Sequence, residues 1–387
     1  MGFDFDTIVE RRGTASAKWD LADDGMLPMW VADMDFAAPP EVVEALRDRL
    51  DHPVFGYTLV SDSYREAFRD WQRRRNRLDI EPQSVLSTPG VMPAIRAAID
   101  ALSEPGDQIV VQTPVYYPFF DAVRSKRRRL RFNPLREDDL HYRMDFEQLE
   151  GLFRGGARLL LFSSPHNPVA RVWTVAELQR LAELVRRWDV TVISDEIHSD
   201  IIYPAARFVS LLSLVPERCV ACFSVSKTFN LAGIGASQTV VPDELLRGRL
   251  AAVLKRDGLA SVENALSLAA AEAAYRHGEP WLEALLRYLR FNSALLGEEL
   301  ARRLPEVRMT PQQGTYVAWL DFRALQRDRG LHDAQLKRVL ERRARVWLSP
   351  GVQFGRGGCG FQRLNFAAAR SVVAQAIDRI CDAFERP

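Results

Sequence analysis

The chain has 387 residues, of which 47% are hydrophobic and 27% charged, and its formal net charge at pH 7 is +1. This composition is typical of a globular protein, and the near-neutral charge argues against nucleic acid or an anionic membrane as a partner. The length exceeds the roughly 250–300 residues at which a single hydrophobic core stops growing, so we expect more than one domain.

Strands and helices alternate through the first two thirds of the chain. Apolar runs predict strands in SVLSTPG (84–90), QIVVQTP (108–114), ARLLLFSSP (157–165), VTVISDE (190–196) and CVACFSVS (219–226). Helices are predicted within 91–107, where a Pro-Gly turn closes the helix, and at 174–189, where a capping box of Thr174 and Glu177 opens it. The strands are continuously apolar, which is typical of parallel strands buried on both faces. The pattern predicts an α/β protein with helices on both sides of a mostly parallel sheet.

The last third of the chain has a different pattern. Helices dominate from about residue 243, including a long one near 280–303, and short strands and helices follow residue 314. We expect an N-terminal segment (1–45) that packs with a smaller α+β domain (286–387), and a large domain between them (46–285).

Polar residues follow two of the predicted strands. Asp195 ends a buried strand, where its carboxylate needs a cationic partner such as a protonated ring nitrogen. His198 follows three residues later and is either a ligand-binding or a satisfied structural histidine. Lys227, beside Ser224 and Ser226, follows the next strand. A desolvated lysine has a lowered pKa and can react with a carbonyl group, and the serine hydroxyls can bind a phosphate.

The other strand ends carry weaker signals. Gly90, Val91 and Met92 open a helix whose N-terminus can bind an anion, Tyr116 can stack on a flat ligand, and Asn167 lies in a sharp turn. Taken singly, these patterns are better explained as a helix entry, a core aromatic residue and an Asn-Pro turn. In such sheets, however, ligands bind beyond the carboxyl ends of the strands. Together the strand ends predict a site for one small, aromatic, phosphorylated cofactor.

Several motifs resemble those of a known family. SDEIH (194–198) and SVSKTFNLAG (224–233) resemble fold-type I pyridoxal-phosphate enzymes. The resemblance narrows to the cystathionine β-lyase/C–S lyase subfamily of class I/II aminotransferases, the PatB/MalY-like group, through MWVADMDF, VFGYT, TPVYYPFF, SPHNPVARVW, GTYVAWLDFR and GFQRLNFA. It covers nearly the whole chain. It implies pyridoxal 5'-phosphate as cofactor, and release of a thiol, pyruvate and ammonia from an L-cysteine S-conjugate.

The resemblance also implies roles for single residues. Lys227 would hold the cofactor covalently and later move the Cα proton, and Asp195 would pair with the pyridine nitrogen. Asn167 and His198 would lie near the phenolic oxygen of the ring, and Tyr116 would stack on it. The residues implied around the cofactor phosphate are Gly90, Val91, Met92, Ser224 and Ser226.

Three further roles concern the substrate and a second chain. Arg363 would bind the substrate carboxylate through a bidentate pair. Tyr57 would reach the cofactor phosphate of a neighbouring subunit, which implies a homodimer with a shared active site. Residues 30–33 would line the substrate entrance.

Some positions depart from the family pattern. Ala170, Val225 and NFAAAR (365–370) stand where glycine, proline and a Cys-Pro are common, and we interpret them as packing changes. Gly235 stands eight residues after Lys227, where typical aminotransferases of this class have a phosphate-binding arginine. This difference favours a lyase. The alternatives are an aminotransferase and a non-catalytic binding or regulatory protein on the same fold.

Other patterns carry no function in this interpretation. Cys219 and Cys222 form a C-x-x-C, but residues three apart on a strand point to opposite faces. The histidines have no metal-ligand spacing, so no metal is expected. FGRGGCGF (354–361) resembles a dinucleotide-binding loop but opens no helix. The arginine clusters at 73–75 and 126–129 are interpreted as solvated faces.

Nothing in the sequence predicts export or membrane insertion. The first residues are charged and form no signal peptide, and no apolar run approaches the roughly 18 residues of a membrane span. Four cysteines in a chain of this length do not form a disulfide framework. A reducing cytoplasm is the expected location.

Overall fold

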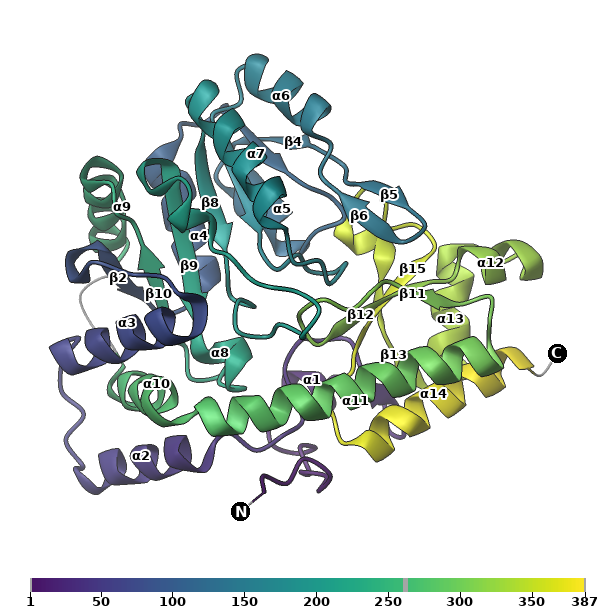
Figure 1. Ribbon diagram of the computed structural model, residues 1–387. Helices are drawn as coiled ribbons and strands as arrows, with labels where there is room; N and C mark the ends of the chain where they lie inside the picture. The colour runs from purple at the N-terminus through teal and green to yellow at the C-terminus, as the bar shows by residue number, and fades with distance from the viewer. Residues whose placement is uncertain (1, 260–263, 386–387) are drawn as a thin grey trace.

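The computed structural model describes residues 2–259 and 264–385, and within them seven strands form a central sheet (Figure 1). The strand order is β2-β10-β9-β8-β7-β3-β4. The strands are β2 (Val85–Thr88), β3 (Gln108–Val111), β4 (Arg129–Phe132), β7 (Leu159–Ser163), β8 (Thr191–Asp195), β9 (Cys219–Ser224) and β10 (Ser237–Val240). Strands β4, β3, β7, β8 and β9 pair in parallel, and β10 is antiparallel to both β9 and β2. The prediction of a mostly parallel sheet is confirmed.

Helices cover both faces of this sheet, and each face has its own cluster of buried apolar residues. One face carries α4 (Val91–Leu102), α5 (Pro118–Ser125) and α9 (Glu244–Arg256). The other carries α3 (Asp62–Asn76), α6 (Phe146–Arg154), α7 (Val175–Arg187) and α10 (Ala265–His277). Successive strand residues alternate between the two clusters, which explains why the strands are apolar throughout. Cys219 and Cys222 fall in different clusters, so they do face opposite sides of the sheet.

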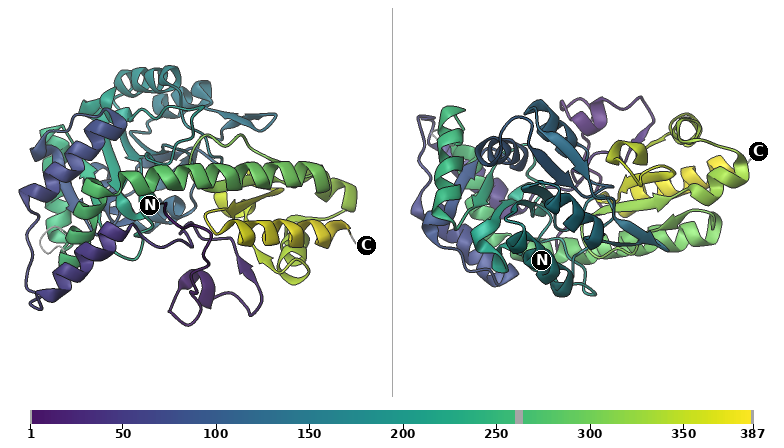
Figure 2. Two further views of the ribbon diagram at one scale, coloured as in Figure 1. Left: turned by 60° about the horizontal axis from the view of Figure 1, so that its bottom comes forward. Right: turned by 90° about the horizontal axis from the view of Figure 1, so that it is seen from above.

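A long helix, α11 (Glu279–Arg303), runs from the central sheet to a second, smaller sheet (Figures 1 and 2). This sheet has the order β11-β12-β15-β14, with β11 (Arg308–Met309), β12 (Val317–Asp321), β14 (Ser349–Pro350) and β15 (Phe361–Asn365). Helices α12 (Arg323–Arg329), α13 (Asp333–Arg342) and α14 (Arg370–Glu385) accompany it, and α14 packs on α11. The expected boundary between residues 285 and 286 falls inside α11, and the division into domains stays a prediction.

The remaining elements are short or peripheral. They are α1 (Ala17–Asp20), α2 (Pro40–Asp51), β5 (Arg136–Asp138) paired with β6 (His141–Arg143), and β1 (Leu27–Pro28) paired with β13 (Val346–Trp347). The capping box of Thr174 and Glu177 is present at the start of α7, as predicted.

One of the arginine clusters differs from its interpretation as a solvated face. Arg128 is buried, its Nη1 lies 3.2 Å from Asp100 Oδ1, and its Nε donates to Ser103 Oγ at 3.0 Å. The solvated-face interpretation is therefore wrong for Arg128, because an acidic and a polar partner compensate the buried guanidinium.

Candidate active site

The carboxyl ends of the central strands border one cavity of about 290 Å³. Its lining includes Gly90, Val91, Met92, Tyr116, Asn167, Asp195, His198, Ser224, Ser226, Lys227 and Arg363. These are the residues expected around the cofactor and the substrate, with the exception of Tyr57. They come from loops far apart in the sequence, and the parallel strands bring those loops to the same edge of the sheet.

Lys227 lies in α8 (Val225–Thr228), a short helix that begins where β9 ends. The Ser224 side chain caps this helix by accepting a hydrogen bond from the Ser226 N–H at 3.1 Å. Lys227 lines the cavity, and its Nζ donates to the Ala32 carbonyl oxygen at 2.5 Å. Within residues 2–259 and 264–385, no carboxylate forms an ion pair with this amine.

The surroundings of Lys227 favour the uncharged amine. Burial lowers its pKa from 10.5 to about 8, the charges of Asp33 and Asp195 oppose the shift, and that of Arg363 adds to it. A larger share of this amine is therefore unprotonated near neutral pH than for a surface lysine. The unprotonated amine is the form that attacks a carbonyl carbon or accepts a proton.

Asp195, the last residue of β8, is a buried carboxyl group on the cavity wall. Its Oδ1 accepts a hydrogen bond from the Ile197 N–H at 3.1 Å, and no basic side chain of the described chain forms an ion pair with it. Burial raises the pKa of this carboxyl to about 7. A buried carboxylate without a counter-charge fits a ligand that brings a cation, such as a protonated ring nitrogen.

His198 also presents an unsatisfied group. The ring is buried and packs edge-to-face on Tyr316, with the centroids 5.8 Å apart. Its Nδ1 has no hydrogen-bond partner among the described residues. Burial lowers the pKa of the imidazole to about 3, so the ring is neutral at physiological pH. An unpartnered nitrogen on a cavity-lining ring favours the ligand-binding interpretation over the structural one.

Arg363 brings a positive charge from the second sheet into the cavity. It lies on β15, is 3% exposed, and donates to Asn167 Oδ1 at 3.0 Å and to the Trp30 carbonyl at 2.8 Å. Its guanidinium carbon lies 5.0 Å from the centre of the Phe354 ring. In the described part of the chain no acidic side chain pairs with it, so the arginine is held in place by neutral groups and fits a ligand carboxylate.

The N-terminus of α4 and the serines of β9 and α8 form another part of the lining. Gly90 is the N-cap of α4, where the first backbone N–H groups of a helix favour an anion. The Ser224 hydroxyl lies 2.6 Å from the Ala236 carbonyl, to which it donates. The Ser224 and Ser226 hydroxyl oxygens also lie 2.9 Å apart, so both serines are held at the start of α8.

Gly235 lines the same cavity and has a backbone that favours glycine. Its φ is +69°, and a Cβ added there would lie 3.1 Å from the Pro89 carbonyl oxygen. Replacing it by a residue with a side chain would strain the backbone. The local geometry therefore disfavours an arginine at this position.

Tyr57 does not take part in this cavity. It is 92% exposed, and Val54, Phe55 and Leu59 beside it are 64%, 58% and 84% exposed. The role of Tyr57 in the site of a neighbouring subunit stays a prediction.

The segment at the cavity entrance contains a contact that the sequence did not reveal. Trp30, Val31 and Ala32 line the cavity, whereas Asp33 is not part of the lining and pairs with Arg11 at 2.8 Å. The Ala32 carbonyl accepts hydrogen bonds from Lys227 and, at 2.9 Å, from the hydroxyl of Tyr316. A backbone acceptor has no side-chain signature, and Tyr316 belongs to the motif GTYVAWLDFR, in which it was given no role of its own.

The described residues offer neither a metal site nor a membrane span. They contain no group of three or more His, Cys, Asp or Glu side chains arranged to hold a metal ion. None of their helices is long and apolar enough to cross a membrane.

The sequence profile of the aminotransferase class I and II family matches residues 25–383, and the chain belongs to this family. Cystathionine beta-lyase PatB of Bacillus subtilis (strain 168) is 41% identical over 97% of this chain and 98% of its own length. Protein MalY of Escherichia coli (strain K12) is 33% identical over 98% of each chain.

Solved structures agree with this assignment. Cystalysin from Treponema denticola, which contains a pyridoxal 5'-phosphate cofactor, has a TM-score of 0.95 and 34% identity, covering 100% of this chain and 99% of its own. The C-S lyase from Staphylococcus hominis, bound to pyridoxal phosphate, has a TM-score of 0.94 and 29% identity, covering 99% of this chain and 98% of its own. The expected fold-type I architecture is confirmed.

Proposed function

We propose that this chain is a pyridoxal-phosphate-dependent carbon–sulfur lyase. It cleaves L-cystathionine or a related L-cysteine S-conjugate to a thiol, pyruvate and ammonia. The observation that carries the proposal is the cavity in which Lys227, Asp195 and Arg363 are together and without ion-pair partners among the described residues. The similarity to cystathionine beta-lyase PatB, over 97% of the chain, supports the reaction.

The lining of the cavity fits the cofactor group by group. The Lys227 amine suits the aldehyde, the Asp195 carboxylate suits the ring nitrogen, and the Tyr116 ring offers a flat face. Asn167 and the unpartnered nitrogen of His198 suit the phenolic oxygen. The N-terminus of α4 and the Ser226 hydroxyl suit the phosphate.

Arg363 orients the substrate. Its guanidinium binds the α-carboxylate of the amino acid by a charge-assisted bidentate contact, while Asn167, Trp30 and Phe354 hold the arginine in place. A substrate fixed at its carboxylate presents a defined Cα–H bond, so less orientational freedom is lost on the way to the transition state.

Lys227 moves the proton of the reaction. When bound, pyridoxal phosphate withdraws electron density from the Cα of the amino acid, which makes its hydrogen acidic. The Lys227 amine accepts this proton, the Cβ–S bond breaks with both electrons going to sulfur, and the thiolate leaves. Addition of one water releases the remaining three carbons as pyruvate and the nitrogen as ammonia. The lowered pKa near 8 leaves part of the amine free to act as a base near neutral pH.

An aminotransferase is the main alternative within this family. It would use the same lysine and arginine but needs a keto acid to complete its cycle. The glycine geometry of residue 235, where such enzymes carry a phosphate-binding arginine, favours the lyase. A non-catalytic protein on this fold would not need to keep Lys227, Asp195 and Arg363 in one cavity.

We also propose that the working unit is a homodimer. The exposed apolar stretch with Val54, Phe55, Tyr57 and Leu59 supports contact with a second copy, since such groups are unfavourable in water. In the dimer Tyr57 would donate to the cofactor phosphate of the partner. A cytoplasmic location is part of the same proposal, supported by four cysteines that are all free.

A product assay tests the function. The holoenzyme is incubated with L-cystathionine and with S-methyl-L-cysteine, without a keto acid, and thiol, pyruvate and ammonia are measured together. Equal release of all three by the wild type, and none by Lys227→Ala, is the expected result. No release, followed by amino transfer once a keto acid is added, would identify an aminotransferase instead. Inactivity under both conditions would favour the non-catalytic alternative.

A further inference from the structure

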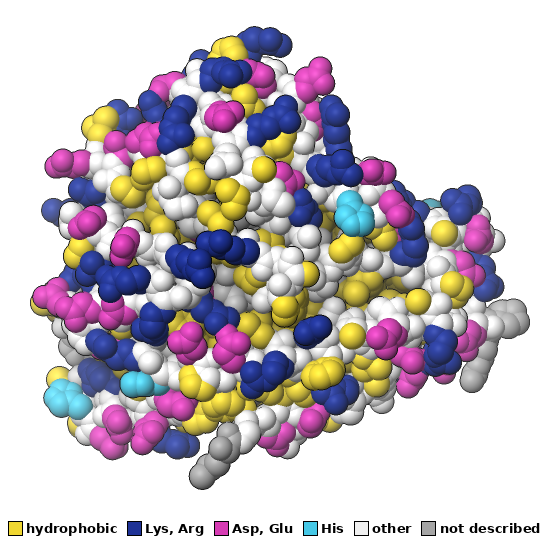
Figure 3. All heavy atoms as spheres, in the orientation of Figure 1, with side chains coloured by type: hydrophobic (Ala, Val, Ile, Leu, Met, Phe, Trp, Pro, Cys, Tyr) yellow, Lys and Arg dark blue, Asp and Glu magenta, His cyan; other side chains and the backbone are white. Residues whose placement is uncertain are grey.

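A second cavity, of about 390 Å³, lies between the end of α3, the segment 199–208 and the first half of α11. Lys and Arg side chains gather near the middle of the face shown in Figure 3. The volume is within the range of small-molecule sites, roughly 300–1,000 Å³. Nothing in the proposed lyase reaction uses this cavity.

Its lining has an excess of positive charge. The basic residues are Arg75, Arg77, Arg207, Arg287 and Arg290, and the acidic ones are Glu283 and Asp200. Arg75 pairs with Glu283. Asp200 is buried and accepts a hydrogen bond from Thr228 Oγ1 at 2.8 Å, and burial raises the pKa of its carboxyl group.

The other four arginines have no partners of their own. The side chains of Arg77, Arg207, Arg287 and Arg290 form no ion pair or hydrogen bond with any residue that the structure describes. They come from three separate segments of a chain whose net charge is only +1, so the local excess is not a consequence of overall composition. Four guanidinium groups around one cavity repel each other, and an anion between them would remove that cost.

The neighbouring arginines of α3 behave differently. Arg73 pairs with Asp70 at 3.2 Å and Asp79 at 3.0 Å, and Arg74 lies 3.7 Å from Glu279. They fit the predicted solvated face, in which each charge is compensated at the surface. The contrast sets the arginines of the cavity apart from an ordinary charged helix.

The lining also includes an apolar part. Ile202, Phe208 and Leu286 belong to it, and Phe208 is 7% exposed. Arginine forks bind phosphate oxygens in pairs, and an apolar wall accommodates an organic group next to them. We propose that this cavity binds a small organic phosphate, with its phosphate groups on Arg77, Arg207, Arg287 and Arg290 and its organic part against Ile202 and Leu286.

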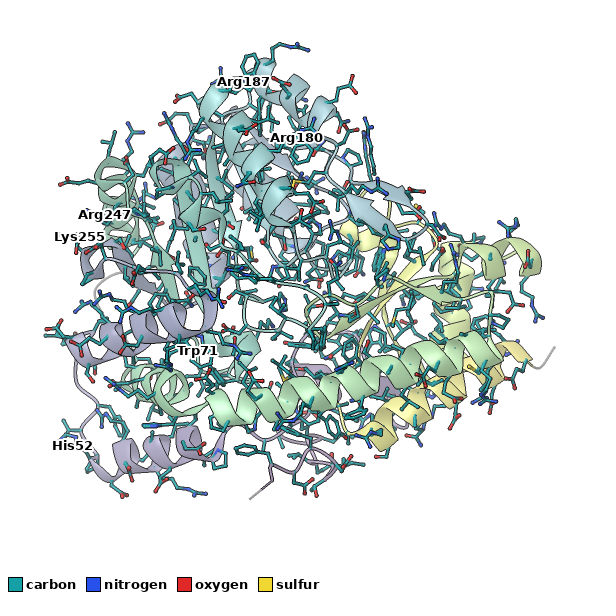
Figure 4. The ribbon with its side chains drawn as sticks, viewed as in Figure 1. His52, Trp71, Arg180, Arg187, Arg247 and Lys255 are labelled. Carbon is teal, nitrogen blue, oxygen red and sulfur yellow. The ribbon has the colours of Figure 1, made fainter. Side chains whose placement is uncertain are left out.

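This site is joined to the catalytic elements by short connections. His198 lines the catalytic cavity, and the next two residues, Ser199 and Asp200, line the second cavity. Asp200 also accepts a hydrogen bond from the indole N–H of Trp71, which is labelled in Figure 4, at 3.1 Å. A further hydrogen bond comes from the hydroxyl of Thr228, the residue directly after Lys227. An occupant would therefore contact the segments that position His198 and Lys227.

Calorimetric titration of the holoenzyme with ADP tests the proposal. Bound pyridoxal phosphate already occupies the phosphate end of the catalytic cavity, so ADP reports on the second site. The expected result is one ADP per chain, displacement by inorganic pyrophosphate, no binding of adenosine, and an affinity that falls as salt increases. Absence of binding by both ADP and pyrophosphate would overturn the proposal.

A matched pair of variants locates the binding. R207E/R287E reverses two exposed arginines of the cavity, and R249E/R338E reverses two exposed arginines elsewhere whose side chains likewise form no ion pair or hydrogen bond in the described chain. The affinity for ADP should fall at least tenfold, or about 1.4 kcal/mol, in the first variant and stay unchanged in the second. Equal affinities in the two variants would assign the binding to general surface charge. Urea unfolding of both variants checks that each is folded. The test does not depend on the lyase reaction, so its failure would leave that proposal intact.

Discussion

Two enclosed lysines of this chain have opposite surroundings. The Lys18 side chain is 0% exposed and lies 2.7 Å from Asp35 and 3.7 Å from Asp33. Lys227 donates to a single carbonyl, and burial lowers its pKa to about 8. The two carboxylates bind Lys18 and hold segments of the chain together, whereas burial without an ion pair lowers the pKa of Lys227. Lys18 is buried and paired, whereas Lys227 is partly buried and has no ion-pair partner among the described residues.

The two lysines are also connected. Lys18 and Arg11 bind the carboxylates of Asp33 and Asp35, and these residues closely follow Ala32, whose carbonyl accepts a hydrogen bond from Lys227. The paired lysine therefore supports the position of the unpaired one. The following substitutions separate the two roles.

Replacing Lys227 should have the largest effect on catalysis. Lys227→Ala removes the base that we propose for the Cα proton, and we expect kcat/KM for L-cystathionine to fall by about 10²–10⁴-fold. The free energy of unfolding should change little, because no ion pair is lost. Lys255, exposed on α9 and labelled in Figure 4, is the matched control, and Lys255→Ala should keep full activity. A Lys227→Ala enzyme with more than a tenth of wild-type activity would contradict the assignment.

Replacing Lys18 should instead affect stability. Lys18→Met leaves Asp35 with Arg11 alone as its cationic partner, and breaking a buried pair in this way costs about 3 kcal/mol. Urea unfolding measures this loss, and Lys255→Met should show none of it. The remaining folded enzyme should bind substrate and cofactor, with a reduced kcat if the Ala32 carbonyl has moved. An unchanged midpoint of urea unfolding would mean that the ion pairs of Lys18 do not stabilise the fold.

Arg363→Lys tests the second unpaired cation. Lysine keeps the charge but loses the bidentate geometry, at a cost of about 1.5–3 kcal/mol, so KM should rise by roughly 10–100-fold. A substrate analogue without the α-carboxylate, such as an S-alkyl cysteamine, should be turned over equally slowly by both enzymes. If the variant turned over the analogue more slowly than the wild type, by the same factor as for the amino acid, Arg363 would not be the carboxylate-binding group.

The smallest effect concerns the unpaired carboxyl group. In cofactor-free protein the pKa of Asp195 is about 7, above the unfolded value of roughly 3.9. The folded state then binds more protons between these values, so this carboxyl costs stability as pH rises from about 4 to 7. Asp195→Asn should therefore stabilise the cofactor-free protein more at pH 8 than at pH 5, by on the order of 1–2 kcal/mol. Equal stabilisation at both pH values would contradict the raised pKa.

The strands that the sequence predicted are those with a strong local signal. Residues 191–195 and 219–224 are continuously buried, and their polar ends point to the site. Two strands of the central sheet were not predicted. β4 reads RLRF and begins within the basic cluster, and β10 reads SQTV, with polar residues that are buried by their neighbours. Their strand conformation depends on pairing with β3, β9 and β2, which a local pattern cannot reveal.

The sequence by itself determined the class of fold, the family and the side chains of the catalytic cavity. Apolar runs followed by polar residues recur along the chain. Because the strands pair in parallel, the polar residues at their ends come together in one site. The tertiary structure alone decided which charges are paired. The ion pairs of Lys18, the Ala32 carbonyl at Lys227, and the four arginines around the second cavity each join segments far apart in the chain. Pairing of charges depends on distances of a few ångströms between such segments, and composition and periodicity carry no information on those distances.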